Sequence, residues 1–169
     1  MQKSAVLSLL LVLIVSGAAA AQSREPSKPI RPFVVKTRQS LAEIERSLRS
    51  DNKVTDLVGG AGMELRVAIQ HDKKKDLSDA ELHDASDDVY YVLEGSARLT
   101  LGGRLEAPRE ISLGEWRAAK IIGGETFTIR KGDLIIVPRG TPHHRINTPG
   151  KEFSLILIKV FAEPLPAKP

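Results

Sequence analysis

From Met63 onward the chain is a series of short runs with the two-residue period of β-strands, and no helical period interrupts them. In residues 64–71 apolar and polar side chains alternate strictly, so the row from Leu65 to His71 is predicted to face one side of a sheet. Strands that follow one another without intervening helices predict an all-β, antiparallel sandwich or barrel. Further runs of this kind, separated by glycine, proline and aspartate, lie at residues 89–93, 97–101, 127–129, 134–137 and 153–161.

The residues before this region divide into three segments. Residues 1–21 combine a positive start, an apolar run and a series of alanines, the pattern of a secretory signal peptide cleaved after residue 21. The alternative is an uncleaved membrane anchor, although the apolar run is shorter than the roughly 20 residues that span a bilayer. Residues 22–37 contain three prolines among polar residues and are predicted to form an extended arm or linker. A short helix is predicted over residues 40–49, with Ser40 as its N-cap.

One domain is expected for a chain of 169 residues, over residues 38–163, with a barrel at 63–162 and an irregular tail at 164–169.

The chain has no cysteine, which excludes a disulfide scaffold, a cysteine nucleophile and a thiolate metal site. An exported, mildly basic chain without disulfides fits a bacterial periplasm, or a secreted protein, with no membrane contact after signal cleavage. Nucleic acid is not an expected partner, because no aromatic residues interleave with the single tight basic run at 73–75.

The most specific string in the chain is GDLIIVPRGTPHHRIN, at residues 132–147. Glycine followed by aspartate is predicted to make a tight turn into a buried strand. The proline and the second glycine are predicted to end that strand in a bend, after which a histidine opens the next strand. The fixed positions of the pattern are Gly132, Pro138, Gly140, His143 and Asn147.

This string matches the second motif of the cupin superfamily at every fixed position, so the chain resembles a cupin. The first cupin motif, H-x-H-x3,4-E-x6-G, corresponds to ELHDASDDVYYVLEG at residues 81–95, where Gly95 sets the register. In that register Asp88 stands at the glutamate position, His83 at the second histidine position and Glu81 at the first. The resemblance covers roughly residues 63–160 and implies a double-stranded β-helix, which is a jelly-roll barrel of antiparallel strands.

In cupins these positions bind one divalent metal inside the barrel, so the resemblance implies a ligand set of two imidazoles and two carboxylates. Such mixed ligands suit Mn²⁺, Fe²⁺, Zn²⁺ or Ni²⁺. The implied ligands are Glu81, His83, Asp88 and His143. Glu81 is alternatively a base beside the metal or a surface residue, and Asp84 or Asp87 replaces Asp88 if the register differs. A further alternative is a cupin without metal that uses the barrel as an organic-ligand pocket.

Strand parity assigns further side chains to the barrel interior. Tyr90 shares the parity of the first motif's acid and is a candidate proton donor, with core packing as the alternative. Arg145 shares the parity of His143 and is a candidate for binding a substrate carboxylate, whereas His144 must point to the opposite side. His71 is either an inward-facing, substrate-binding residue or an exposed residue at the end of its strand.

The segment between the motifs, residues 104–131, is long for a small barrel and contains Trp116, the single tryptophan. It is predicted to be a lid over the barrel mouth or a dimer contact. Trp116 is accordingly a candidate for anchoring this segment and binding substrate, or for plugging the apolar end of the barrel.

These patterns predict an exported, single-domain cupin whose metal acts as a Lewis acid on a small oxygenated metabolite, with Glu81 or Tyr90 moving the proton. Isomerase, lyase and oxygenase chemistry all occur in the family, and the fold does not choose among them. The alternative is a non-catalytic periplasmic cupin that binds a sugar or another small molecule without metal. The family resemblance also implies a homodimer.

Overall fold

A computed structural model of the chain describes residues 26–73 and 78–165. The chain divides into two units, residues 1–33 and 34–169. In the first unit, residues 26–33 form neither helix nor strand, in agreement with an extended arm. The predicted signal peptide lies outside the described residues. None of the helices in the described ranges is long and apolar enough to cross a membrane.

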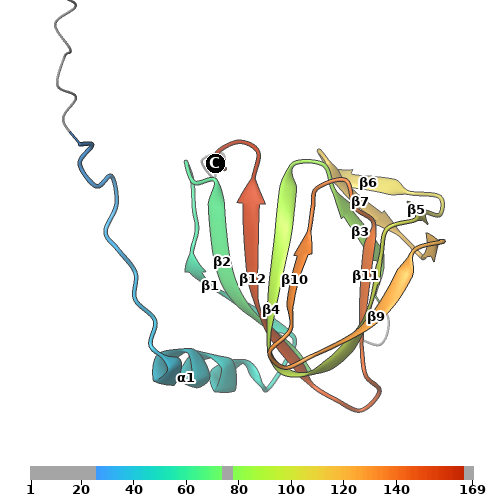
Figure 1. The fold of residues 1–169 in the computed structure, drawn as a ribbon, viewed down its shortest axis with the longest axis horizontal. Coiled ribbons are helices and arrows are strands. Elements are labelled where there is room, and N and C mark those ends of the chain that lie inside the picture. The colour runs from blue at the N-terminus through green and yellow to red at the C-terminus, as the bar shows by residue number, and fades with distance from the viewer. Residues whose placement is uncertain (1–25, 74–77, 166–169) are drawn as a thin grey trace, which may run out of the picture. The chain divides into compact units, whose positions relative to one another are not determined.

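Among its described residues, the second unit contains one helix and twelve strands (Figure 1). In chain order they are α1 (Arg38–Leu48), β1 (Lys53–Val58), β2 (Leu65–Asp72), β3 (Ala80–His83), β4 (Ser86–Leu101), β5 (Arg104–Leu105), β6 (Arg109–Ser112), β7 (Glu115–Ala118), β8 (Ile121–Ile122), β9 (Glu125–Arg130), β10 (Leu134–Val137), β11 (His143–Asn147) and β12 (Phe153–Phe161).

Strand β4 belongs to both faces of the barrel. Its first half pairs with β12 and β10, and its second half pairs with β11 and β9. The chain turns between the two sheets near Gly95, where φ is +82° and an added Cβ would lie 2.0 Å from the carbonyl oxygen of Glu152. Only glycine tolerates both conditions. The two strands predicted at 89–93 and 97–101 are therefore one strand bent at Gly95.

Every strand pair is antiparallel, which confirms the predicted all-β, antiparallel jelly-roll barrel. One sheet follows the order β1, β2, β12, β4, β10, and the other contains β9, the end of β4, β11, β3, β7 and β6. Much of the segment 104–131 extends the second sheet, because β6 and β7 form a hairpin whose second strand pairs with β3. The lid or dimer role of this segment stays a prediction.

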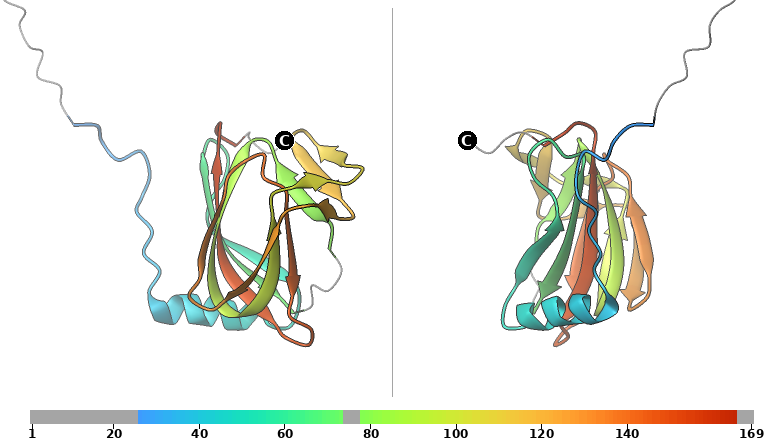
Figure 2. Two further views of the ribbon diagram at one scale, coloured as in Figure 1. Left: turned by 45° about the vertical axis from the view of Figure 1, so that its right-hand side comes forward. Right: turned by 90° about the vertical axis from the view of Figure 1, so that its left-hand side faces the viewer.

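Helix α1 packs against β2 on the outer side of the first sheet, and the right-hand view of Figure 2 shows it across the strand ends. Its N-cap is Thr37, whose side chain accepts a hydrogen bond from the backbone N–H of Ser40. The predicted N-cap at Ser40 is therefore wrong by three residues, because Thr37 supplies the capping oxygen. Glu45 and Leu48 are the buried residues of the helix.

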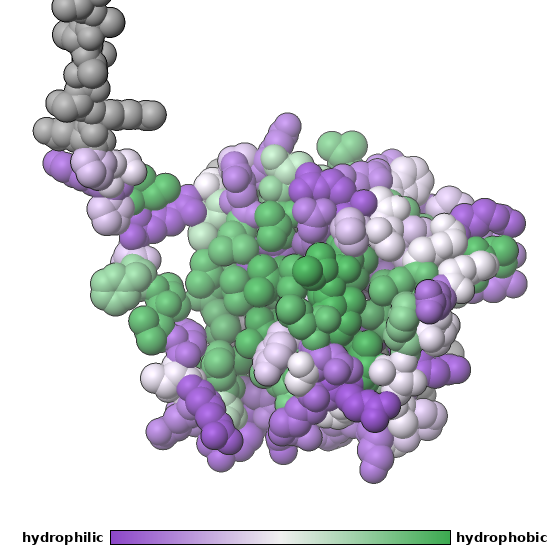
Figure 3. Space-filling view, viewed as in Figure 1, coloured by the Kyte–Doolittle hydropathy of each residue, from purple (hydrophilic) through white to green (hydrophobic). Residues whose placement is uncertain are grey.

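The interior of the barrel is filled by an apolar cluster from β4, β12, β9 and β10, which includes Val92, Leu99 and Phe153. The outer face of the first sheet carries a broad apolar area over β2, β12, β4 and β10 (Figure 3). Leu134 and Ile136 are 63% and 64% exposed there.

The described end of the predicted tail, at residues 164–165, is irregular and hydrogen-bonded to residues 62 and 63.

Candidate metal centre

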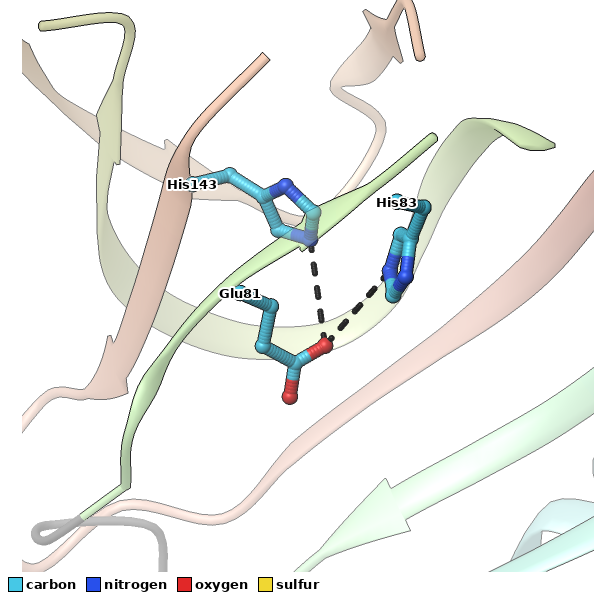
Figure 4. Close-up of side chains that lie close together, drawn as sticks. All are labelled: Glu81, His83 and His143. Atoms are coloured by element: carbon cyan, nitrogen blue, oxygen red, sulfur yellow. Dashed lines mark ion pairs between the residues drawn. The ribbon is translucent and has the colours of Figure 1, made fainter. Parts of the chain in front are cut away.

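Three potential metal ligands converge from neighbouring strands of the second sheet. Glu81 and His83 are two residues apart on β3, and β11 places His143 directly opposite Glu81. One carboxylate oxygen of Glu81 lies 3.7 Å from Nε2 of His83 and 3.8 Å from Nε2 of His143 (Figure 4). The ligand atoms of all three residues lie within 4.8 Å of one another. Strand pairing thus brings together three of the four predicted ligands.

The other ring nitrogen of each histidine is held by a hydrogen-bond acceptor. Nδ1 of His83 lies 2.7 Å from a carboxylate oxygen of Glu115, and Nδ1 of His143 lies 3.0 Å from the carbonyl oxygen of Thr141. Because both partners accept, each Nδ1 carries the proton and each Nε2 presents its lone pair. Both Nε2 atoms are buried and have no hydrogen-bond partner within the described ranges.

The turn of the second motif brings the two histidines together. The backbone N–H of Gly140 donates to the carbonyl oxygen of His83 at 2.8 Å, and that of Thr141 donates to Pro138 at 3.1 Å. The φ of Gly140 is +76°, a conformation that favours glycine. The motif therefore positions His143 through one backbone hydrogen bond to β3 and one within the turn.

Asp88 is buried beside this group but is occupied by other partners. Nζ of Lys159 lies 2.6 Å from one carboxylate oxygen, and the hydroxyl of Tyr90 donates to the other at 3.1 Å. Burial alone would raise the pKa of Asp88, but its contacts with His83 and Lys159 lower the pKa to about 2. The carboxylate of Asp88 is not among the three groups that share the 4.8 Å separation. Its role as a metal ligand stays a prediction.

A cavity of about 80 Å³ adjoins these residues, and its lining includes His143, Tyr90, Asp88, Lys159 and Arg145. The guanidinium of Arg145 forms a buried ion pair with Asp72 at 2.8 Å and lies over the ring of Phe153, 4.8 Å from its centroid. The predicted inward orientation of Tyr90 and Arg145 is therefore correct.

Burial also shifts the pKa of two side chains at this cavity, and both shifts favour the neutral form. It lowers the pKa of His143, which favours the neutral imidazole that a metal needs. It raises the pKa of Tyr90 well above its usual value of 10, which keeps the phenol protonated.

The barrel resembles several solved structures. No family model and no curated protein matches the chain. It is similar to the BH2720 protein of Bacillus halodurans, with a TM-score of 0.55 and 20% identity, over 82% of this chain and 88% of that chain. For the TT1209 protein of Thermus thermophilus the TM-score is 0.50 and the identity 17%, over 75% and 96% of the two chains.

An uncharacterised Klebsiella pneumoniae protein with a double-stranded β-helix domain is a third similar structure, at a TM-score of 0.48 and 15% identity, over 73% and 88% of the two chains. The two-sheet antiparallel barrel, closed by the bent strand β4, is itself a double-stranded β-helix. The chain has the cupin fold. At these identities the likeness concerns the fold alone.

Two predicted site residues lie outside the cupin cavity. His71 pairs with Ser154 across β2 and β12, and both face α1 rather than the barrel interior. His71 is neither inward-facing nor exposed, as its two alternatives had it, because α1 covers that row of β2 and leaves the residue 1% exposed, while the neighbouring residue Gln70 lines the cavity. Trp116 lies opposite Leu82, so its side chain is on the other face of the sheet from His83 and outside the cavity.

The structure also shows the positions of His144 and of the two aspartates that were alternatives to Asp88. His144 points away from the metal group, as predicted, and its Nε2 lies 2.7 Å from the carbonyl oxygen of Ser78. Asp84 accepts a hydrogen bond from the indole of Trp116, and Asp87 pairs with Arg139 on the surface. Neither aspartate belongs to the metal group.

Three charged residues of the cupin site were not predicted. Glu115 and Arg117 lie on β7, where Arg117 is 3.8 Å from Glu81 and 3.5 Å from Glu115. Their strand was not recognised, and no local signal in the segment connects it with β3. Lys159 is different, because it is the single charged side chain in the apolar run of the last strand. That position was a detectable signal of a buried charge.

The side chains fit a divalent metal. Two ligand atoms that share a metal at about 2.0–2.2 Å lie at most about 4.4 Å apart. The separations of 3.7 and 3.8 Å between the Glu81 oxygen and the two Nε2 atoms satisfy this limit, and the separation between the two imidazoles lies within 4.8 Å. Each imidazole directs its Nε2 lone pair toward the carboxylate of Glu81. Each Nδ1 is held by a hydrogen-bond acceptor, as is common for histidines that bind a metal.

Proposed function

We propose that this cupin binds one divalent metal through Glu81, His83 and His143 and acts on a small oxygenated metabolite. The observation that carries the proposal is the pair of buried Nε2 atoms, which both face the carboxylate of Glu81 and have no hydrogen-bond partner in the described part of the chain. Leaving two buried imidazole acceptors unsatisfied is costly unless a further group binds them.

The residues around the cavity have complementary tasks. A bound divalent ion supplies Lewis-acid polarisation of a substrate oxygen. The phenol of Tyr90, kept protonated by burial and hydrogen-bonded to Asp88, is placed to donate a proton at a substrate oxygen. Arg145, which also lines the cavity, is placed to orient a carboxylate or carbonyl through its guanidinium. The small volume of the cavity favours a substrate of a few heavy atoms.

The proposal is tested by measuring metal content in protein lacking residues 1–21, purified without an affinity metal column. We expect about one equivalent of a transition metal in the parent, and loss of most of it in His83→Ala, His143→Ala and Glu81→Gln. His144→Ala is the matched control, because its ring points away from the group. A metal-free parent after incubation with Mn²⁺, Fe²⁺, Ni²⁺ and Zn²⁺, or unchanged content in the three variants, would contradict it.

The second candidate is a metal-free cupin that binds a small molecule. It is favoured by the buried ion pairs Lys159–Asp88 and Arg145–Asp72, which line the cavity with hydrogen-bonding groups of both signs. This function requires saturable binding of a sugar or small acid in the presence of a chelator, with no turnover.

Export to the periplasm or beyond and assembly as a homodimer remain proposals. Export is supported by the signal pattern of residues 1–21. The homodimer is supported by the exposed apolar area of the first sheet, since monomeric proteins rarely leave large apolar patches uncovered.

A further inference from the structure

The strand pairing that builds the cavity also places a cation opposite Asp88. Lys159 on β12 is the direct partner of Asp88 on β4, and both side chains face the barrel interior. The side chain of Lys159 is 14% exposed and that of Asp88 is 4% exposed. Two opposite charges at this depth stabilise one another, and removal of either leaves an uncompensated buried charge.

Both oxygens of the Asp88 carboxylate are engaged. One lies 2.6 Å from Nζ of Lys159, and the other accepts the hydroxyl of Tyr90 at 3.1 Å. The second oxygen is nevertheless 3.6 Å from Nε2 of His83, as near as the Glu81 oxygen that belongs to the metal group. Asp88 is therefore within reach of the centre but bound to another cation.

We propose that Lys159 sets the ligand number of the metal centre by withholding Asp88 from it. The inference rests on the proposed function and adds to it a positioning residue. With Lys159 in place, the metal has two imidazoles and the Glu81 carboxylate as protein ligands, and its remaining positions stay open for small oxygen ligands. Without the lysine charge, the Asp88 carboxylate turns toward the metal as a fourth ligand.

The experiment is a titration of metal-free protein with Co²⁺, whose visible absorption reports coordination as well as occupancy. The variants are Asp88→Asn, Lys159→Met and the double variant. Asp88→Asn is expected to keep the Co²⁺ spectrum of the parent, because no ligand is lost, while the unpaired charge of Lys159 lowers its affinity. Lys159→Met is expected to bind at least about tenfold more tightly with an altered spectrum, because an added anionic ligand is a change of at least that size.

The double variant separates ligand gain from a general change in the cavity. It has neither charge, so we expect the affinity and spectrum of the parent. It also keeps the inference testable if Lys159→Met alone is too unstable, because the unpaired buried carboxylate is then absent. Lys159→Arg, which retains the pairing, and the surface variant Lys151→Met are the matched controls and should behave like the parent.

The outcomes distinguish this inference from the proposed function. If the parent binds no Co²⁺, both fail. If the parent binds Co²⁺ but the double variant, in which no charge is left unpaired, loses affinity by tenfold or more, as a lost ligand requires, Asp88 is a ligand and only this inference is overturned. A parent-like affinity and spectrum in Lys159→Met also overturns it.

Discussion

The carboxylate of Glu115 lies 2.7 Å from Nδ1 of His83, and this contact connects the β6–β7 hairpin to the candidate metal centre. Register explains the contact, because Glu115 stands directly opposite His83 in the β3–β7 pair. The carboxylate fixes the proton on Nδ1 and thereby leaves Nε2 as the metal-facing acceptor.

Removal of this carboxylate should weaken metal binding without removing a ligand. We expect Glu115→Ala to lower metal affinity by about 10–100-fold, the usual effect of losing such an outer partner. Glu115→Gln retains an acceptor oxygen and should lose less. Affinity measured by calorimetric titration tests this, with the exposed Glu125→Ala on β9 as control. Equal affinity in the parent and Glu115→Ala would show that the tautomer is fixed in another way.

The ion pair of Asp88 should make the metal-free protein sensitive to acid. Burial raises the pKa of Asp88, but its contacts with His83 and Lys159 outweigh burial and lower it to about 2, below the value of about 3.9 in an unfolded chain. A folded pKa below the unfolded pKa means that the stabilisation is complete above pH of about 4 and is lost as the pH falls toward 2.

Melting temperature against pH tests this effect. We expect a flatter acid limb for Asp88→Asn than for the parent, because the substituted side chain does not titrate. Asp87→Asn is the comparison, since the pKa of Asp87 is also lowered to about 2, chiefly by its hydrogen bonds from Arg139, but on the surface. Solvent screens that pair, so its effect should be smaller. Identical acid limbs for the parent and Asp88→Asn would refute the prediction.

Two glycines with similar backbone angles should differ in their tolerance of alanine. Gly95 has φ of +82° and an added Cβ would meet the Glu152 oxygen at 2.0 Å, whereas Gly132 has φ of +91° with open space around it. Gly132→Ala should therefore cost only the conformational strain, about 1–2 kcal/mol. Gly95→Ala adds a backbone clash and should cost more than about 3 kcal/mol. Denaturant unfolding measures both, and equal losses would mean that β12 yields to the methyl group.

The buried network under α1 should affect stability but not metal binding. Ser154 donates to Glu45 at 2.9 Å and lies 2.8 Å from Nδ1 of His71. Ser154→Ala leaves both partners without this hydroxyl and should cost about 1–3 kcal/mol of unfolding free energy. Metal affinity should stay at the parent value, because the network lies outside the barrel. Reduced affinity in a folded Ser154→Ala variant would instead connect His71 with the metal centre.

The apolar face of the first sheet should govern self-association. Ile136 is 64% exposed on this face, so Ile136→Glu should leave the fold intact and shift the chain from dimer to monomer. Light scattering after size-exclusion chromatography measures the mass. Leu113→Glu is the control, since Leu113 is 97% exposed in the turn between β6 and β7. A parent that is already monomeric at micromolar concentration rules out the dimer.

Much of the barrel was predictable because the side-chain period of a strand is local. The last strand was predicted at its observed bounds of residues 153–161, and alternation identified most of β2. The glycines, the proline and His143 of the second motif were recognisable for a similar reason, since turn geometry depends on a few adjacent residues. Strands β1, β6 and β7 were missed because their short sequences carry no clear alternation of their own.

The sequence by itself determined how side chains alternate between the two faces of a strand. Glu81 therefore shares a face with His83, and His143 shares one with Arg145. The sequence did not determine which face of β2 is covered by α1, because burial of a face depends on what packs against it; His71 was misplaced for that reason. Only the tertiary structure placed Glu115 on His83 and Lys159 on Asp88. Those contacts depend on strand register between distant segments, and electrostatic pairing in a buried site acts over a few ångströms of space rather than along the chain.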